Sequence, residues 1–227
     1  MELRDGLRTT GSVRTFTAQP IDDAVLFDVL DDARFAPSGG NRQAWRVIVV
    51  RDAEQRRQLS AAYLNAWHDY VASLLAGVTP FSPLASDEER EAVTAKRVAA
   101  EAQSAPDGFA ETLDEAPALL LVVADLAAFA ATDRDLDRYH LVGGASVYPF
   151  IWSLLLAAHE RGLGGVMTTV ATANEPRLRE IFSLPSTFVV ASLVVLGYPE
   201  RRATKLRRRE VPEFTFVDRF GGPAFRP

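Results

Sequence analysis

A polar segment lies directly in front of an apolar run in the stretch FAPSGGNRQAWRVIVV, which spans residues 35–50. The segment consists of Pro37, Ser38, Gly39, Gly40, Asn41 and Gln43. Glycines let other groups approach the backbone closely, and the two amide side chains offer hydrogen-bond donors and acceptors. Such a segment is poor core material, but it is suited to holding a small polar ligand beside a sheet. A plain helix-to-strand loop is the alternative.

Basic residues are concentrated near the C-terminus of an otherwise acidic chain. The net charge is −5, from 25 basic and 30 acidic residues. Six of the basic residues fall within nine positions: Arg201, Arg202, Lys205, Arg207, Arg208 and Arg209. Arginine side chains pair well with phosphate oxygens, so this segment is a candidate anion site. A solvated surface loop is the alternative that the composition leaves open.

Two further groups offer hydrogen-bond donors. Ser12 and Arg14 place a hydroxyl and a guanidinium before the first predicted helix. After a long apolar helix come four residues whose backbone could approach a planar ligand: Gly164, Gly165, Thr168 and Thr169. The alternatives are a surface salt bridge for Arg14 and a helix end followed by a strand for the second group. The presence of all these groups on one chain favours a ligand site.

Several kinds of chemistry are excluded or disfavoured by composition. The chain has no cysteine, and its three histidines form no metal-binding spacing, so we expect no metal site. There is no Walker loop, nucleophile elbow or paired-carboxylate arrangement, so no catalytic side chain is predicted. The acidic balance argues against nucleic acid as a partner. Without a secretory signal or a run of about 20 apolar residues, we expect no membrane partner and a cytoplasmic location.

Apolar periodicity predicts a sheet covered by helices on both faces. Helices are expected at 21–35, 55–75, 87–103, 144–161 and 174–182, and strands at 46–51, 118–124 and 188–197. Asn174 is the expected N-cap of its helix. The helix at 144–161 is apolar on nearly every side, which indicates burial in the core or in a subunit interface.

The 227 residues are expected to form a single domain. A lid-like helical excursion is predicted at about 77–110, closed by Pro106, Asp107 and Gly108, and a C-terminal arm at about 200–227. The aromatic residues of 214–225 lack a helical period. We therefore expect that part of the arm to be a strand that pairs outside its own core.

The chain resembles the FMN-dependent nitroreductase superfamily. The matching stretches are SVRTF, APSGGNRQAW, GGASVYPFIWSLLLAAHERGLG and LVVLGYP followed by KLRRR, in family order over nearly the whole chain. The resemblance implies an α+β fold with three α/β/α layers, a central mixed sheet and an intertwined homodimer. It also implies two FMN molecules at the subunit interface.

The resemblance also assigns roles by position. Ser12 and Arg14 would meet the FMN phosphate or ribityl chain. The ribityl chain and the ring would be lined by Pro37, Ser38, Gly39, Asn41 and Gln43. Gly165 and the backbone of Thr168 and Thr169 would face flavin N5. Lys205, Arg208 and Arg209 would complete the phosphate clamp, with Arg207 as a further candidate.

Two departures from the family pattern stand out. Thr10 and Gly11 occupy positions at which relatives commonly carry an arginine, and Arg8 is the candidate replacement. In the long helix, Trp152 and Ser153 replace a frequent Gln-Asn pair. The first departure is expected either to weaken FMN binding or to mark a shifted cofactor preference.

The implied activity is ping-pong hydride transfer from NAD(P)H through FMN to a nitroaromatic, a quinone or an activated alkene. One alternative on the same fold is a specialised biosynthetic flavin enzyme that catalyses dehydrogenation, dehalogenation or flavin fragmentation. The other is an FMN-binding protein without turnover.

Overall fold

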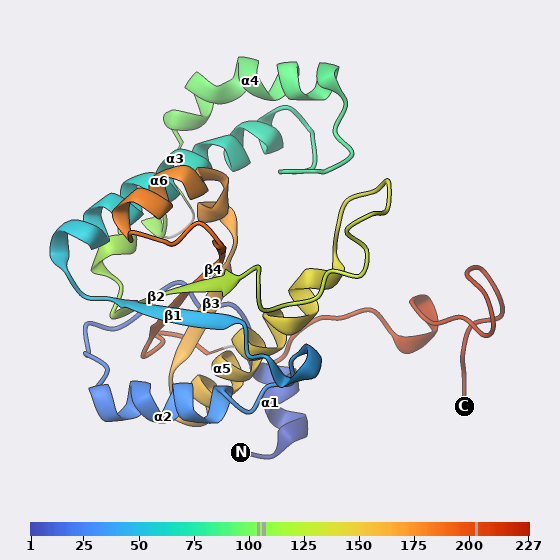
Figure 1. Cartoon of the computed structure of the whole chain (residues 1–227), viewed down its shortest axis with the longest axis horizontal. Coiled ribbons are helices and arrows are strands. Elements are labelled where there is room, and N and C mark those ends of the chain that lie inside the picture. Colours follow the sequence, from blue (N-terminus) through green and yellow to red (C-terminus); the bar gives the residue numbers. More distant parts are fainter. Residues whose placement is uncertain (104, 106–107, 203) are drawn as a thin grey trace.

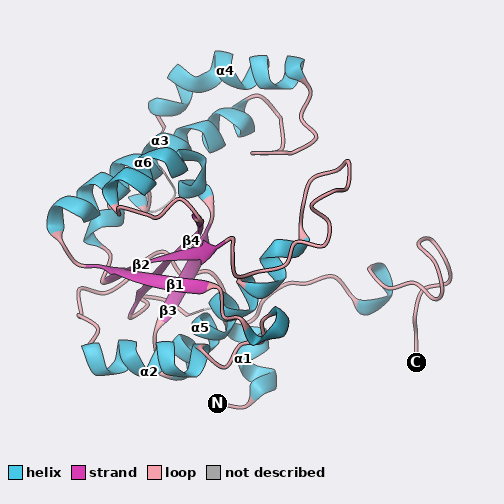
Figure 2. Cartoon of the chain, viewed as in Figure 1, coloured by secondary structure: helices cyan, strands magenta, loops and turns pink. Residues whose placement is uncertain are grey.

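The computed structural model describes residues 1–227 except Ser104, Pro106, Asp107 and Ala203. A four-stranded sheet lies between two helical layers, as the sequence predicted (Figures 1 and 2). The strands are β1 (Trp45–Val50), β2 (Ala118–Asp125), β3 (Gly164–Thr168) and β4 (Phe188–Gly197), in the spatial order β1-β2-β4-β3. β1 and β3 are therefore the two edges.

All pairings between the four strands are antiparallel. The connection after β1 returns the chain to the end of the sheet at which β1 finished, since Val50 pairs with Leu119, so β2 runs in the opposite direction. The four strands therefore form an antiparallel sheet rather than the mixed sheet that was expected, and the parallel pairing of Ser12 with Gly165 is an isolated bridge outside these strands.

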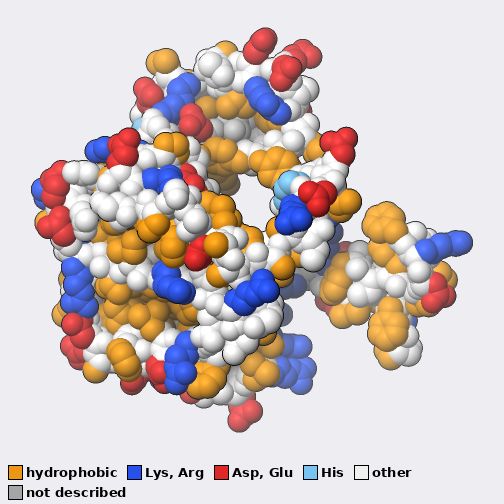
Figure 3. Space-filling model, in the orientation of Figure 1, with side chains coloured by type: hydrophobic (Ala, Val, Ile, Leu, Met, Phe, Trp, Pro, Cys, Tyr) orange, Lys and Arg blue, Asp and Glu red, His pale blue; other side chains and the backbone are white. Residues whose placement is uncertain are grey.

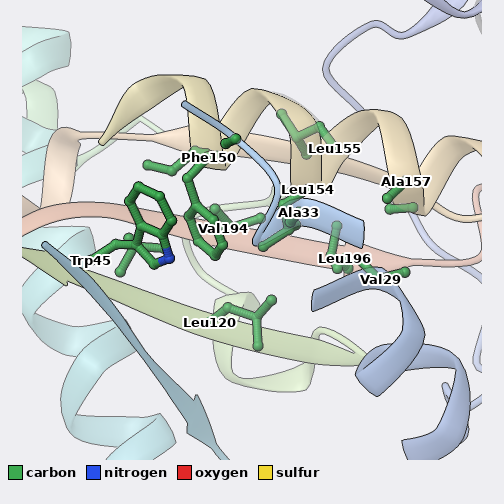
Figure 4. Close-up of a cluster of buried hydrophobic side chains, with 14 of the residues drawn as sticks. Val29, Ala33, Trp45, Leu120, Phe150, Leu154, Leu155, Ala157, Val194 and Leu196 are labelled. Carbon is green, nitrogen blue, oxygen red and sulfur yellow. The ribbon is translucent and has the colours of Figure 1, made fainter. Parts of the chain in front are cut away.

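One helical layer contains α2 (Asp23–Ala33) and α5 (Tyr148–Glu160). The N-terminal helix α1 (Leu3–Thr9) contacts α5. α2 and α5 pack on the sheet through the cluster shown in Figure 4, which includes Leu154, Val194 and Leu196. Trp45 and Phe150 stack within it, with ring centroids 4.9 Å apart. This packing fixes where the chain enters β1.

The other layer contains α3 (Ala53–Leu75) and α6 (Glu175–Ile181), with α4 (Asp87–Glu101) on the outer side of α3 (Figure 1). α3 begins at Asp52, whose carboxylate accepts a hydrogen bond from the Gln55 amide. α4 begins with a capping box between Ser86 and Glu89. α3 contributes Leu59 and Tyr63 to the cluster on this face of the sheet.

The structure corrects three local predictions. α5 begins at Tyr148 rather than at 144, because residues 142–146 form the 3₁₀ turn η4 (Val142–Ser146) and Pro149 lies in the first helical turn. Asn174 precedes α6, but its side-chain amide donates to the Ala62 carbonyl instead of capping the helix. β3 begins at Gly164 and so includes both glycines that were expected to end the preceding helix.

The C-terminal segment stands away from the body of the chain (Figure 1). In its described part it contains the 3₁₀ turn η6 (Val211–Glu213) and an antiparallel bridge between Phe216 and Ala224. Residues 214–225 thus pair with themselves here, and pairing with another chain remains a prediction. Among the described helices, none combines the length and apolarity needed to cross a membrane.

Candidate functional site

A cavity of about 770 Å³ lies along the β3 edge of the sheet. The N-terminal segment contributes Ser12 and Arg14, and the end of β3 contributes Thr168 and the following Thr169. These are four of the predicted site residues, and the fold brings them together from positions more than 150 residues apart in the chain.

Aromatic side chains form one wall of this cavity. Tyr63, Trp67 and Tyr70 on α3 stack in series, with interplanar angles of 11° and 15°. Phe109 meets Tyr63 edge to face at 6.0 Å. Trp67 and Tyr70 are half-buried and give the cavity apolar surface, whereas Tyr63 is buried. The sequence analysis did not identify this wall, although the i, i+4, i+7 spacing of the three α3 aromatics was a signal for it.

The charge of the cavity is positive. Arg14 and Arg201 line it, and no carboxylate is among its described lining residues. The Arg14 guanidinium carbon lies 5.9 Å from the centre of the Phe109 ring, which holds the cation over an aromatic face. Arg201 follows the strand pair formed by Phe16 and Pro199. The predicted clamp did not include Arg201.

The glycines of β3 are required by close packing. The Val13 amide donates to the Gly165 carbonyl over 2.9 Å, so the N-terminal segment lies directly on β3. A Cβ atom on Gly165 would lie 2.6 Å from the Val195 carbonyl oxygen, which is closer than van der Waals contact allows. Gly165 is buried and is not among the residues that line the cavity.

The segment after β3 is held from two sides. The Tyr63 hydroxyl lies 3.3 Å from Thr168 Oγ1, and the Ser192 hydroxyl donates to the Thr168 carbonyl over 3.0 Å. Burial raises the pKa of Tyr63, so this hydroxyl keeps its proton. Within the described part of the chain, no acceptor is found for the Thr169 N–H. Thr169 is an exposed residue that lines the cavity.

The loop at 37–43 adopts an unusual backbone. Gly40, Asn41 and Gln43 have φ values of +58°, +53° and +48°, in the left-handed region that favours glycine. The Gln43 amide donates to Ser38 Oγ over 3.0 Å, and its side chain donates to Asn41 Oδ1 over 3.1 Å. Internal hydrogen bonds therefore maintain this conformation. Pro37, Gly39, Asn41 and Gln43 are exposed, and Ser38 is half-buried.

This loop and the cavity lie at opposite edges of one end of the sheet. The loop enters β1 at Trp45, which pairs with Ala124, and the cavity lies at the end of β3, where Thr168 pairs with Leu193. Two strands separate the edges, so the distance across the sheet is about 14 Å, from three strand spacings. None of the predicted residues of the loop lines the cavity.

The remaining basic residues of the predicted clamp are exposed. Lys205, Arg208 and Arg209 lie where the chain leaves the body, and none of them lines the cavity. Arg208 donates to the neighbouring Arg207 carbonyl over 2.7 Å. Of the expected lid, Phe109, Gln103 and Ala105 line the cavity, whereas α4 lies outside it. Pro106 and Asp107, the expected closing turn, and Ser104 lie outside the described residues.

Comparisons with known proteins agree with this architecture. The sequence model described as the nitroreductase family matches residues 7–198. A Thermus thermophilus protein named NADH dehydrogenase is 29% identical, with 83% of this chain and 82% of that protein covered. A Bacillus subtilis protein named FMN reductase [NAD(P)H] is 24% identical over 87% of this chain and 66% of its own length, so this chain spans just under two thirds of it.

Solved structures show the same fold. The structure of oxidized iodotyrosine deiodinase bound to FMN and 3-iodo-L-tyrosine has a TM-score of 0.65 at 24% identity. The alignment covers 96% of this chain and 100% of that one.

Proposed function

Because this chain belongs to the nitroreductase family, we propose that it is an FMN-dependent oxidoreductase that uses NAD(P)H. FMN, when bound, would supply hydride transfer between the nicotinamide and an electron acceptor, each visiting the site in turn. The names of relatives support both cofactors, since they include an NADH dehydrogenase, an FMN reductase and an FMN-bound deiodinase.

The observation that carries the proposal is the combined chemistry of the cavity. A volume of about 770 Å³ is within the range of small-molecule sites, which is roughly 300–1,000 Å³. Arg14, Arg201 and Ser12 provide donors for a phosphate, while Trp67 and Tyr70 of α3 provide apolar surface for a ring. The residues present therefore fit a planar phosphorylated ligand.

The chain's own contribution is binding and electrostatics. The Thr169 N–H is a donor for negative charge that develops on the ring. Arginines on an acidic protein attract and orient the phosphate, and the aromatic wall excludes water from one side of the site. No side chain has to act as nucleophile, which suits a cysteine-free chain without a catalytic acid–base pair. We infer nitroaromatics, quinones and activated alkenes as acceptors.

We further propose that the active form is a homodimer in which each site takes elements from both chains. The donors of residues 37–43 are exposed at one edge of the sheet and the cavity lies at the other. A second copy could place its loop against this cavity without any change in either fold. Exposed aromatic side chains on the C-terminal arm, including Phe214, Phe216 and Phe220, offer the arm a means to bind that copy (Figure 3).

A direct experiment tests the proposed activity. Purified protein is expected to be yellow, with the absorbance of bound flavin, and to oxidise NADH or NADPH when a nitroarene or quinone is added. Protein that is colourless and binds no added FMN would overturn the proposal. Flavin that binds but is reduced by neither nicotinamide would instead favour a binding protein without turnover.

Reductive dehalogenation is a second candidate function. The likeness to an iodotyrosine deiodinase and the aromatic wall of the cavity favour it. A hydride equivalent from the nicotinamide, two electrons and one proton, would replace a carbon–halogen bond by carbon–hydrogen and release halide. Halide release from a halogenated phenol, with negligible turnover of nitroarenes, would support this reaction over the first.

A further inference from the structure

Two buried hydroxyl groups converge on Thr168 from opposite faces of the sheet. Tyr63 is 2% exposed and belongs to the apolar cluster beneath α3. Ser192 is fully buried and has the same parity in β4 as Val194 and Leu196, which pack toward α2 and α5. Both lie among apolar neighbours, where a polar group is unfavourable unless it is hydrogen-bonded.

The Tyr63 and Ser192 hydroxyls both make their contacts with Thr168. Tyr63 Oη lies 3.3 Å from Thr168 Oγ1, and that oxygen also accepts the Val170 amide at 3.4 Å. Ser192 donates to the Thr168 carbonyl at 3.0 Å and shares its proton with the Leu193 carbonyl at 3.2 Å. The peptide that joins Thr168 to Thr169 is thus held through its own carbonyl oxygen.

That peptide carries the Thr169 N–H, for which no acceptor is found among the described residues, and Thr169 lines the cavity. A peptide is planar, so fixing the Thr168 carbonyl also fixes the direction of the Thr169 N–H. Thr169 itself has φ −103° and ψ 0°, and η5 (Val170–Asn174) follows it. The bond from Asn174 to the Ala62 carbonyl ties the far end of η5 to α3 as well.

We propose that Tyr63 and Ser192 are positioning residues that fix the direction of the Thr169 N–H toward the flavin and thereby raise its reduction potential. This inference rests on the proposed function, because it requires that a flavin occupies the cavity. A donor held in place before charge develops stabilises that charge without reorganisation, whereas a donor free to rotate loses part of the effect. Neither side chain needs to touch the flavin.

The test is the two-electron midpoint potential of the FMN-loaded protein, measured by spectroscopic titration against reference dyes. Tyr63→Phe and Ser192→Ala are each expected to weaken binding of the reduced cofactor, relative to the oxidised one, by up to tenfold. A tenfold change corresponds to a potential about 30 mV more negative. Thr168→Val should act like Tyr63→Phe, the double variant should show no further shift, and Thr168→Ser should remain near wild type.

Ser73→Ala is the matched control. Ser73 is also buried on α3, but its hydroxyl donates to the Asp69 carbonyl and does not contact the cavity segment. This variant should leave the potential unchanged, which separates positioning from a general loss of stability. Tyr63→Phe keeps the shape of the aromatic ring, so it is expected to fold and bind FMN.

The outcomes distinguish this inference from the function on which it rests. If wild-type protein binds no FMN, the proposed function fails. If FMN binds and the potentials of Tyr63→Phe and Ser192→Ala equal that of wild type, the function stands and the positioning role is wrong. A shift of the same size in Ser73→Ala would also contradict the positioning role.

Discussion

The Gly39 amide donates a hydrogen bond to the Ser146 hydroxyl oxygen over 3.1 Å. Ser146 is buried at the end of η4, two residues before α5 begins, so this bond joins the loop ahead of β1 to the segment that leads into α5. The two segments are more than 100 residues apart in the chain. The loop conformation therefore depends on a residue that was not among the predicted site residues.

Ser146→Ala tests this dependence. Loss of one hydrogen bond that holds the loop should weaken FMN binding by about 0.5–1.5 kcal/mol, which is roughly two- to tenfold. Quenching of flavin fluorescence on titration with protein gives the dissociation constant. Ser60→Ala removes another buried hydroxyl, on α3, and serves as control. Equal affinities for all three proteins would exclude a role of Ser146 in the site.

Arg14→Ala should weaken FMN binding by about 1–3 kcal/mol, because a charged hydrogen bond to the phosphate or ribityl chain is lost. Arg134→Ala removes an exposed arginine from the loop before α5 and should not change the affinity. The same fluorescence titration measures the FMN affinity of both variants. Unchanged affinity in Arg14→Ala would show that the cofactor lies elsewhere.

Gly165→Ala is expected to destabilise the fold rather than to affect ligand contacts. The added methyl group would overlap the Val195 carbonyl oxygen, and such overpacking costs about 1–3 kcal/mol. Urea unfolding of the FMN-free protein measures this loss of stability. In the comparison variant Gly77→Ala the methyl group would meet nothing within 4 Å, so any loss of stability there comes from backbone strain at a φ of +72° and not from overlap. A Gly165→Ala protein as stable as wild type would contradict the packing argument.

The loop before α5 should be sensitive to acid through Asp133. Hydrogen bonds from the Leu141 amide, then from the Val142 amide and Arg138, lower the pKa of Asp133 from 3.8 to about 2. The folded-state pKa is depressed, so the contribution of Asp133 to stability is complete above the unfolded value of 3.8. It is lost as the pH falls through about 2.

Asp133→Asn checks this linkage. The difference in unfolding free energy between wild type and variant should be large at pH 5 and should shrink toward pH 2. Asp135→Asn, at a neighbouring exposed position, should show little difference at either pH. A difference for Asp133→Asn that does not change with pH would refute the assignment.

Removal of residues 211–227 tests the role of the arm. If the arm binds a second copy, the full chain should sediment as a dimer at low micromolar concentration and the shortened chain should dissociate more readily. The exposed Phe214, Phe216, Phe220 and Phe225 lie in the removed part. Sedimentation velocity over a range of concentrations measures both species, and identical behaviour would show that the arm does not support association.

Periodicity located most of the regular elements, because burial on one or both faces dictates them, but it did not predict α1 or β3. The strand at 188–197 and the C-terminal end of the helix at 55–75 were predicted to the residue, since apolar runs and turn residues mark them. The start of α5 was wrong by four residues, because the Gly143–Gly144 turn and Pro149 compete with an apolar pattern that continues through them.

The site was harder to predict because it depends on tertiary contacts. Side-chain chemistry identified Ser12, Arg14, Thr168 and Thr169, which do line one cavity. Position in the family pattern assigned Lys205, Arg208 and Arg209, yet Arg201, another of the six basic residues of that segment, lines the cavity. Sequence could not indicate which of six neighbouring cations would be so placed.

The strand order β1-β2-β4-β3 has a genetic consequence. If each reaction centre takes one edge from either polypeptide, a protein defective at Asn41 and another defective at Arg14 would each be inactive alone. Unfolded together and renatured as a mixture, they would form heterodimers with one fully wild-type centre and one doubly impaired centre. If the mixture of the two inactive variants regains part of the activity, the subunits complement each other.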